Sequence, residues 1–361
     1  MMRREVIAAT IARWAVGGTF VFSGLVKSVD PVGTSIFVDE YLAAYSLEGL
    51  GSLSLAAAVV LGAAELSVGV MLCLRLLTRA ASAASAAMLA VFTVVTLLSA
   101  TVLPVGDCGC FGDALSLSPW ATFFKNVVLL PLAVWTYMRH RRDTLSSVWR
   151  LRAVAAAATV VAALGINAYA LSHLPLIDFM PYKVGVDLAS GVRRERAEAQ
   201  AARRTVLVCR NETTGERREF DADDSGWYDG WEVMETRVEE GYAESDFADF
   251  ALYSFSGEEL SDEVFDYASR QHLLCIRGMD RLPQRCLRRL DAFLSRAAQA
   301  GERVVCLTSD VMESDCCMAA GHVLKCYNAD AMVLRSMMRS EAGVVTLDGG
   351  VIVDKRAWRD M

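Results

Sequence analysis

The chain has 361 residues, of which 54% are hydrophobic, and a formal net charge of −7. This composition excludes a disordered or low-complexity protein, and the length exceeds that of one ordinary domain. Long apolar runs fill residues 1–172, whereas residues 173–361 have the composition of a water-soluble protein. We therefore expect a membrane bundle followed by one or two globular units.

Five apolar segments in the first half are long enough to cross a bilayer, which takes about 20 mostly apolar residues. They are residues 6–26, 53–72, 80–103, 120–138 and 153–171. The first follows Arg3 and Arg4 and could be a signal peptide, but its length favours a retained anchor. We predict a four-helix transmembrane domain over residues 1–140, and a loop with a fifth transmembrane helix over residues 141–172.

The charges of the short loops predict the orientation, because basic loops remain in the cytoplasm. With five spans, all basic segments fall on one side: Arg3 and Arg4, Arg75 and Arg79, and Arg139, Arg141, Arg142, Arg150 and Arg152. The other two loops lean acidic, and they hold Lys27, Asp30, Asp39 and Glu40, then Asp107 and Asp113. We predict a multi-pass inner-membrane protein with a cytoplasmic N-terminus and a periplasmic C-terminal domain. Four spans would leave that domain inside.

Residues 173–266 are expected to form a periplasmic strap, a connector and an acidic β-rich region. Residues 173–185 hold two prolines and interfacial aromatics, and residues 189–204 are helix-permissive. Residues 205–209 and 217–220 are typical of a β-hairpin. Between residues 212 and 266 there are 19 acidic residues and three arginines. This acidic surface argues against nucleic acid or anionic lipid as a partner, and its simplest interpretation is a solvated face.

Residues 267–361 change to alternating strands and helices. Strands are predicted at 272–277, 303–308, 343–347 and 351–355, and helices at 283–300 and 329–338. Gly301 is expected to end the first helix, which carries Leu287, Leu290 and Leu294 on one face. This order resembles the thioredoxin fold, so the predicted fold class is an α-helical membrane bundle followed by an α/β thioredoxin-like soluble domain.

Ten cysteines are the candidates for chemistry, and nine of them are predicted to lie outside the membrane in an oxidising compartment. The sharpest pattern is Cys108-Gly109-Cys110, whose thiols are close enough for a reducible disulfide. The flanking Asp107 and Asp113 would raise the thiol pKa, which counts against high reactivity. A redox pair, a structural loop and a metal site remain open, but the loop offers no histidine and we assign no metal.

Glu65 is a candidate proton relay, because a carboxylate inside an apolar span is costly and usually faces the bundle or a cavity. It could pass protons to a quinone or to the cysteine site. The alternative is a structural residue satisfied by Lys125, Asn126 or Arg13. Small residues around Glu65 favour close helix packing in either case.

A resemblance to a known family rests on residues spread over the first 140. They are residues 22–27 with Asp30 and Pro31, Tyr41 and Leu42, Glu65, and the loop 107–113 followed by Phe124, Lys125 and Asn126. Residues 1–140 resemble the MauE/DoxX-like membrane family, four-helix proteins associated with methylamine utilisation and redox-linked functions. The whole chain resembles longer DoxX-family proteins of Bacteroidota that carry a C-terminal periplasmic thioredoxin-like domain.

The resemblance implies a thiol–disulfide role. MauE is implicated in forming or supporting disulfides in an exported enzyme subunit, and its topology is reminiscent of vitamin K epoxide reductase-like bundles. The soluble domain departs from a catalytic thioredoxin, because residues 275–286 hold no Cys-x-x-Cys and Glu341-Ala342-Gly343 stands where a proline is usual. Cys316, Cys317 and Cys326 are a possible secondary redox site, with structural thiols or a local disulfide as the alternative.

Two functional hypotheses follow. In the first, the protein is a membrane-bound thiol–disulfide oxidoreductase or disulfide-assembly factor that acts on exported proteins through Cys108 and Cys110, with a membrane quinone as the potential acceptor. In the second, it is a non-enzymatic anchored binding protein whose inactive thioredoxin-like domain recognises a periplasmic client. A transporter is a weaker third option, because few ionisable residues lie in the spans.

Overall fold

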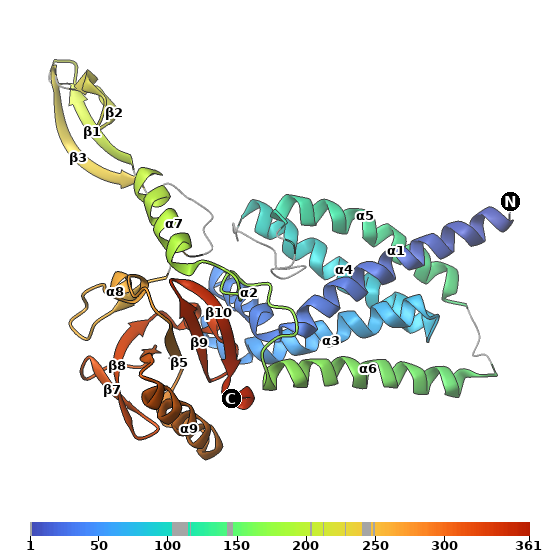
Figure 1. Cartoon of the computed structure of the whole chain (residues 1–361). Helices are drawn as coiled ribbons and strands as arrows, with labels where there is room; N and C mark the ends of the chain where they lie inside the picture. Colours follow the sequence, from blue (N-terminus) through green and yellow to red (C-terminus); the bar gives the residue numbers. More distant parts are fainter. Residues whose placement is uncertain are drawn as a thin grey trace.

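A computed structural model describes residues 2–102, 115, 117–142, 147–202, 204–211, 213–227, 229–239, 247 and 250–361. The predicted redox pair, Cys108 and Cys110, lies outside these residues. Five long helices form the N-terminal bundle (Figure 1): α1 (Met2–Val29), α3 (Ser54–Cys73), α4 (Thr78–Thr101), α5 (Pro119–His140) and α6 (Trp149–Ser172). All five are long and apolar enough to cross a membrane, which confirms the five predicted spans by length and composition.

Helices α1 and α3 pack backbone against backbone because glycines lie at their crossing. A Cβ atom at Gly24 would lie 2.1 Å from the backbone nitrogen of Leu66, and one at Gly69 would lie 2.5 Å from that of Val21. Only glycine permits such an approach, as in other closely packed membrane helices. The predicted close packing around Glu65 is therefore confirmed, and it fixes the register of α3 on α1.

The segment between the first two spans, predicted as a loop, contains a helix, α2 (Pro31–Ala44), followed by the short η1 (Glu48–Leu53). Asp30 caps α2 by accepting a hydrogen bond from the Gly33 nitrogen at 2.7 Å, and Pro31 occupies the first turn. The prediction of a loop for this segment is wrong, and Lys27 lies inside α1 instead of in a loop.

A small sheet stands at the far end of α7 (Leu188–Ala202), away from both the bundle and the C-terminal domain (Figure 1). Its strands are β1 (Arg204–Asn211), β2 (Arg217–Asp221) and β3 (Trp231–Glu239), in the antiparallel order β2-β1-β3, with the short η3 (Ser225–Trp227) between the last two. The predicted hairpin is confirmed. Strand β3 was missed because its glutamates were attributed to a solvated acidic face.

The C-terminal domain is built on a seven-stranded mixed sheet with the order β10-β9-β5-β6-β8-β4, to which β7 adds beside β8. Strands β5, β6 and β8 are parallel, and the other pairs are antiparallel. The elements are β4 (Leu252–Tyr253), α8 (Ser261–Phe265), β5 (Gln271–Ile276), η4 (Met279–Arg281), α9 (Gln284–Ala300), β6 (Arg303–Thr308), β7 (Cys316–Ala319), β8 (His322–Ala329), α10 (Ala331–Met337), β9 (Ala342–Asp348), β10 (Val351–Ala357) and η5 (Trp358–Asp360). The four predicted strands and two predicted helices are present as β5, β6, β9, β10, α9 and α10. Strands β7 and β8 were missed, and β8 lies inside the sheet between β6 and β4.

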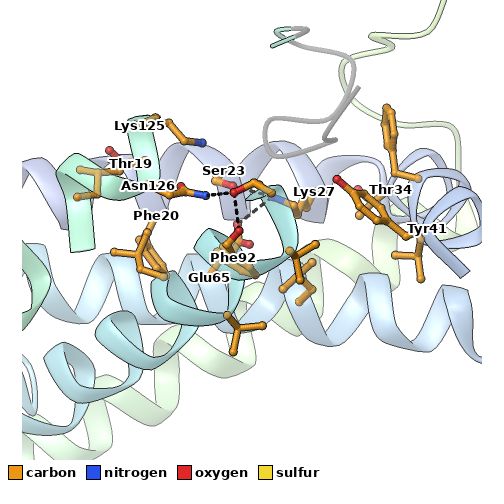
Figure 2. Close-up of a pocket in the computed structure, with 18 of the residues that line it drawn as sticks. Thr19, Phe20, Ser23, Lys27, Thr34, Tyr41, Glu65, Phe92, Lys125 and Asn126 are labelled. Atoms are coloured by element: carbon orange, nitrogen blue, oxygen red, sulfur yellow. Dashed lines mark hydrogen bonds and ion pairs between the residues drawn. The ribbon is translucent and has the colours of Figure 1, made fainter. Parts of the chain in front are cut away.

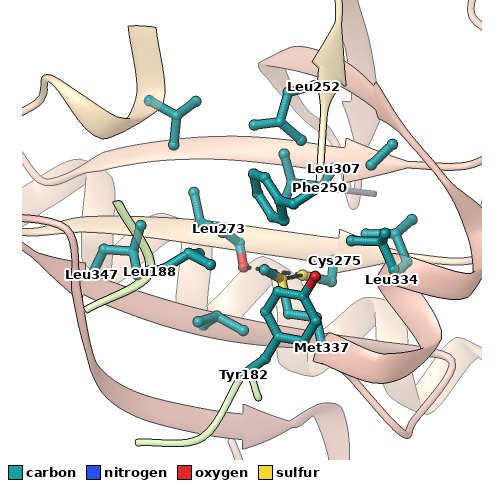
Figure 3. Close-up of a cluster of buried hydrophobic side chains, with 14 of the residues drawn as sticks. Tyr182, Leu188, Phe250, Leu252, Leu273, Cys275, Leu307, Leu334, Met337 and Leu347 are labelled. Atoms are coloured by element: carbon teal, nitrogen blue, oxygen red, sulfur yellow. Dashed lines mark hydrogen bonds between the residues drawn. The ribbon is translucent and has the colours of Figure 1, made fainter. Parts of the chain in front are cut away.

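Helices cover both faces of this sheet. Helix α9 buries Cys286, Leu290 and Leu294 on one face and ends at Gly301, whose φ of 69° is left-handed, as predicted. The other face is covered by α10, α7 and the preceding strap, and Figure 3 shows Tyr182 and Leu188 within that layer. The strap and connector therefore contribute to the core of the α/β domain.

Candidate functional site

The bundle encloses a cavity of about 290 Å³ that is lined by α1, α2, α3, α4 and α5 (Figure 2). Its walls are mainly apolar, with side chains that include Phe20, Phe37, Leu61, Leu89, Phe92 and Leu129. Polar groups reach it from every surrounding helix, among them Ser23, Lys27, Tyr45, Glu65, Thr96 and Asn126. An apolar cavity with a few convergent polar groups is the usual form of a small-molecule site.

A buried ion pair between α1 and α3 forms part of the cavity wall. The Lys27 Nζ lies 3.0 Å from the Glu65 Oε2 and also donates to the Ser23 Oγ at 2.6 Å. The side chains of Lys27 and Glu65 are only 5% and 3% exposed. Ser23 and Lys27 stand one turn apart on α1, so the same face of that helix supplies both groups.

Glu65 was correctly expected to face the bundle interior, but its partner Lys27 was not foreseen. Of the partners considered, Arg13 serves another purpose: it donates to the carbonyl oxygens of Leu72 and Cys73, at the end of α3. The signal that could have found Lys27 was its spacing of one helical turn from Ser23, since α1 continues past Lys27 to Val29. A proton-relay role for Glu65 stays a prediction.

Two further polar groups face the cavity. The Tyr45 hydroxyl is buried and has no hydrogen-bond partner among the described residues. The Asn126 side chain donates to the Thr96 hydroxyl at 3.5 Å, a long contact between α5 and α4. A buried hydroxyl without a partner costs free energy, so the Tyr45 group is suited to a ligand that accepts a hydrogen bond.

Helix α2 has a second face, which docks the α/β domain onto the bundle. Arg335 of α10 donates to the Asp39 carboxylate at 2.7 Å and to the Ser35 hydroxyl at 2.5 Å. One face of this 14-residue helix thus lines the cavity, while the other contacts α10.

The centre of this junction is a buried charge network. Arg339 contacts Asp30 at 2.9 Å and Asp178 at 3.3 Å, and Lys355 contacts Asp178 at 2.5 Å. The Arg339 and Lys355 side chains are 2% and 4% exposed. Burial lowers the pKa of Lys355, and the neighbouring Asp178 opposes that shift. Each charge has an opposite partner, so this network stabilises the contact between the bundle and the α/β domain.

A separate cavity of about 360 Å³ opens at the carboxyl ends of β5 and β6, and it is lined by Arg277, Arg335, Ser309 and Glu341 among others. The Arg277 Nε is buried without a hydrogen-bond partner among the described residues, although its Nη2 donates to the Arg339 carbonyl at 3.1 Å. Burial and the nearby Arg335 lower the pKa of Arg277. Such a site favours an anionic group.

Most cysteines of the α/β domain are buried or partly buried, and Cys316 is the exception. Cys317 and Cys326 form a disulfide, whereas Cys316 is exposed and free. Of the two alternatives for this trio, the structure thus contains the local disulfide. Cys306 lies beside that disulfide and was missed, because its proximity depends on the pairing of β6 with β8.

Buried thiols elsewhere in the domain are protected from reaction. Burial raises the pKa of Cys275 to about 12 and that of Cys286 to about 11. A thiol that is protonated at neutral pH is a poor nucleophile. Cys275 and Cys286 therefore act as small apolar side chains of the core.

Chain connectivity relates the predicted redox pair to the bundle cavity. Helix α4 ends at Thr101 and α5 begins at Pro119, so the segment that carries Cys108 and Cys110 joins them. Both helices line the cavity, through residues that include Phe92, Thr96, Lys125 and Asn126.

Residues 5–139 match the family model described as "Methylamine utilisation protein MauE". The match covers the chain from α1 to the last turn of α5 and includes Lys27 and Glu65. No curated protein matches the chain, and no solved structure does. The chain is thus a multi-pass membrane protein whose N-terminal bundle is MauE-like.

Proposed function

We propose that the protein is a membrane-bound thiol–disulfide oxidoreductase or disulfide-assembly factor for exported proteins. The observation that carries this proposal is the buried Lys27–Glu65 pair on an apolar cavity whose walls include α4 and α5. The segment with Cys108 and Cys110 connects those two helices, so a thiol pair and a proton-handling site are held by the same part of the chain. The MauE-like character of residues 5–139 supports a disulfide-related role.

The proposed reaction begins with the disulfide form of Cys108 and Cys110. A client thiolate attacks one sulfur of the pair and forms a mixed disulfide, and the electron pair leaves on the other cysteine. The second client thiol then attacks the mixed disulfide. The client gains a disulfide bond and loses two electrons, while Cys108 and Cys110 gain those electrons and end as thiols.

A membrane quinone fits the cavity as the oxidant that restores the disulfide. The apolar walls suit a quinone ring, and the Tyr45 hydroxyl, which has no hydrogen-bond partner among the described residues, suits one of its carbonyl oxygens. When bound, a quinone supplies the capacity to accept two electrons and two protons. Phe20 and Phe92 would exclude water, Tyr45 would orient the ring, and the Lys27–Glu65 pair would hold a proton at the Glu65 carboxylate for delivery.

The orientation follows the loop charges. We place the protein in the inner membrane, with its N-terminus in the cytoplasm and residues after 171 in the periplasm. With that placement, α2 and the Cys108–Cys110 segment share the periplasmic end of the bundle with the α/β domain. A client bound to that domain would therefore lie on the same side as the thiol pair.

Trapping of mixed disulfides tests the proposal. Cys108→Ala and Cys110→Ala variants of the full chain are expressed in cells. The remaining thiolate can attack a client disulfide in the reverse direction of the exchange, and no second cysteine of the pair resolves the product, so one of the two variants is expected to accumulate a disulfide-linked exported protein. Cys316→Ala is the matched control, because Cys316 is an exposed thiol in the α/β domain. Failure of both variants to capture a partner, with the wild-type pair always in one redox state, would reject the oxidoreductase.

The second candidate function is client binding by a thioredoxin-like domain of the DoxX type that lacks an active site. The cavity at the carboxyl ends of β5 and β6 favours it, because ligands of α/β sheets commonly bind there. Arg277 also supplies an Nε donor that has no hydrogen-bond partner in the described part of the chain. An Arg277→Met variant would then lose association with an acidic client segment. If disulfide trapping at Cys108 and Cys110 persists unchanged in that variant, client binding at Arg277 is not required.

A further inference from the structure

A third sulfur atom lies beside the disulfide of the α/β domain. Cys317 and Cys326 join β7 to β8, with their Cα atoms 5.8 Å apart. Cys306 of β6 is the direct register partner of Cys326 in the parallel β6–β8 pair. The sulfur atoms of all three residues lie within 4.8 Å of one another, so a free thiol stands next to an existing disulfide.

The three sulfurs form a path from the core to the surface. Cys306 and Cys326 are buried, Cys317 is partly buried, and the adjacent Cys316 is exposed. Their surroundings are apolar, formed by the layer that α9 covers. Burial raises the pKa of the Cys306 thiol, with smaller contributions from Cys275 and Asp310. The thiol is thus preserved in its protonated form and reacts only when it is exposed to base or solvent.

We propose that Cys306, Cys317 and Cys326 form a second thiol–disulfide exchange site, whose substrates are protein disulfides that reach the exposed Cys316–Cys317 edge. The Cys306 thiolate attacks the Cys326 sulfur, a Cys306–Cys326 bond forms, and the Cys317–Cys326 bond breaks. The electron pair leaves on Cys317, which takes up the proton that Cys306 lost. The exchange involves no net oxidation or reduction, and this inference extends the thiol–disulfide role proposed above.

The fold permits the rearranged disulfide. Neighbouring strands lie about 4.8 Å apart, and disulfides span Cα separations of about 4.4–6.8 Å. Cys306 and Cys326 are directly opposite each other, so their side chains emerge on the same face of the sheet. Strand β7 is a four-residue edge strand paired only with β8 within the described part of the chain, so its displacement breaks few hydrogen bonds.

The consequence of the exchange is a change at the surface. In the resting form the disulfide holds the β7–β8 hairpin closed, and Cys316 is the accessible thiol. After the exchange, the disulfide joins Cys306 to Cys326 inside the sheet, and Cys317 becomes a free thiol next to Cys316. The Cys317 thiolate can then attack a client disulfide and form a mixed disulfide, which another client thiol resolves. The client disulfide is thereby isomerised with no net oxidation or reduction, a reaction different from that proposed for Cys108 and Cys110.

Disulfide mapping of the full chain in detergent tests this site. We use a background with Cys108→Ala and Cys110→Ala, so that the outcome is independent of the function proposed for that pair. Cys317→Ser removes the resting disulfide, and after mild oxidation with oxidised glutathione mass spectrometry is expected to find a Cys306–Cys326 bond. Cys316→Ser is the matched control and is expected to keep the Cys317–Cys326 bond.

A measurement with intact Cys306, Cys317 and Cys326 keeps the inference testable if Cys317→Ser fails to fold. In the same background and without reductant, a bulky maleimide is expected to label Cys317 while Cys306 becomes protected. Between pH 7 and pH 9 the labelling rate should rise about tenfold per pH unit, because the thiolate is the attacking species. The inference would be overturned if Cys306 can still be alkylated after denaturation in every sample, because it then never enters a disulfide. It would also be overturned if the three thiols of the reduced protein bind zinc.

Discussion

The bundle cavity and the junction with the α/β domain both bury charge, but in different surroundings. At the junction, the cations Arg339 and Lys355 pair with the carboxylates of Asp30 and Asp178, so protein groups on both sides satisfy these charges. In the bundle, Lys27 and Glu65 meet at the wall of an apolar cavity of about 290 Å³. A buried charge network between two packed surfaces holds them together, whereas a buried pair on an open cavity is available to a ligand or a proton.

The largest effect is expected from Arg339→Met, which tests whether the junction is structural. The substitution leaves the Asp30 and Asp178 carboxylates with one cation fewer, and removal of one partner of a buried pair costs about 3–5 kcal/mol. Thermal unfolding of the full chain in detergent measures this loss of stability. Arg356→Met is the control, because that exposed side chain pairs with Asp354 at the surface and should change stability by about 0.5 kcal/mol or less. Equal effects of the two variants would show that the network does not join the halves.

Glu65→Gln tests whether the pair in the cavity is functional. Loss of a proton-transferring group lowers a rate by about 10²–10⁴-fold, and we expect re-oxidation of the Cys108–Cys110 pair to slow to that extent. Ser67→Ala, two residues away on α3, is the matched control.

The double variant Lys27→Met with Glu65→Leu separates stability from function. Replacement of both charges by apolar groups removes the desolvation cost, so the fold should be kept or strengthened. The re-oxidation rate should stay as low as in Glu65→Gln. Full activity in this stable double variant would contradict a role for the pair.

A smaller effect is expected from Gly24→Ala, which alters the packing that brings Glu65 to Lys27. The new Cβ would meet the Leu66 backbone at 2.1 Å, so α3 must move, at a cost of about 1–3 kcal/mol. Gly18→Ala on the same helix places its Cβ in open space and should be neutral or slightly stabilising. Chemical unfolding compares the two variants, and identical curves would argue against a backbone contact at Gly24.

The smallest effect concerns Cys286, a buried thiol of the α/β domain whose pKa is raised by burial and, to a smaller extent, by the nearby Glu341 carboxylate. Burial raises the pKa of Cys286 to about 11 from its ordinary value of 9.0, so the folded state prefers the thiol. Its contribution to stability is complete below pH 9 and is lost as the pH rises toward 11, because the unfolded chain ionises first. Cys286→Ala should flatten the fall in stability over this range. An unchanged pH slope would show that Cys286 ionises equally well in both states.

The contrast between the two charged regions also shows what a sequence can predict. The five spans and the four predicted strands of the α/β domain depend on local apolarity and period, and those predictions are confirmed. The partner of Glu65 lies 38 residues away, and the pairing depends on glycine contacts between helices. Arg339 and Asp30 are 309 residues apart, and nothing local marks them as partners.

Helix α2 was missed for a different reason. Its 14 residues are too few to cross a membrane and are buried on more than one side, so the segment shows neither the length of a span nor the stripe of a surface helix. The sequence did contain its start signal, an Asp30 cap followed by Pro31. The β7–β8 hairpin, which places Cys306 beside the disulfide, likewise depends on strand register that no single segment specifies.

The most direct test of the central claim follows the redox state of Cys108 and Cys110 in lipid vesicles. The pair is reduced, the reductant is removed, and re-oxidation is followed by alkylation with and without added membrane quinone. We predict that quinone restores the disulfide with one quinol formed per pair, and that Glu65→Gln slows this step while Ser67→Ala does not. Re-oxidation at the same rate without quinone, and equally fast in Glu65→Gln, would contradict the account.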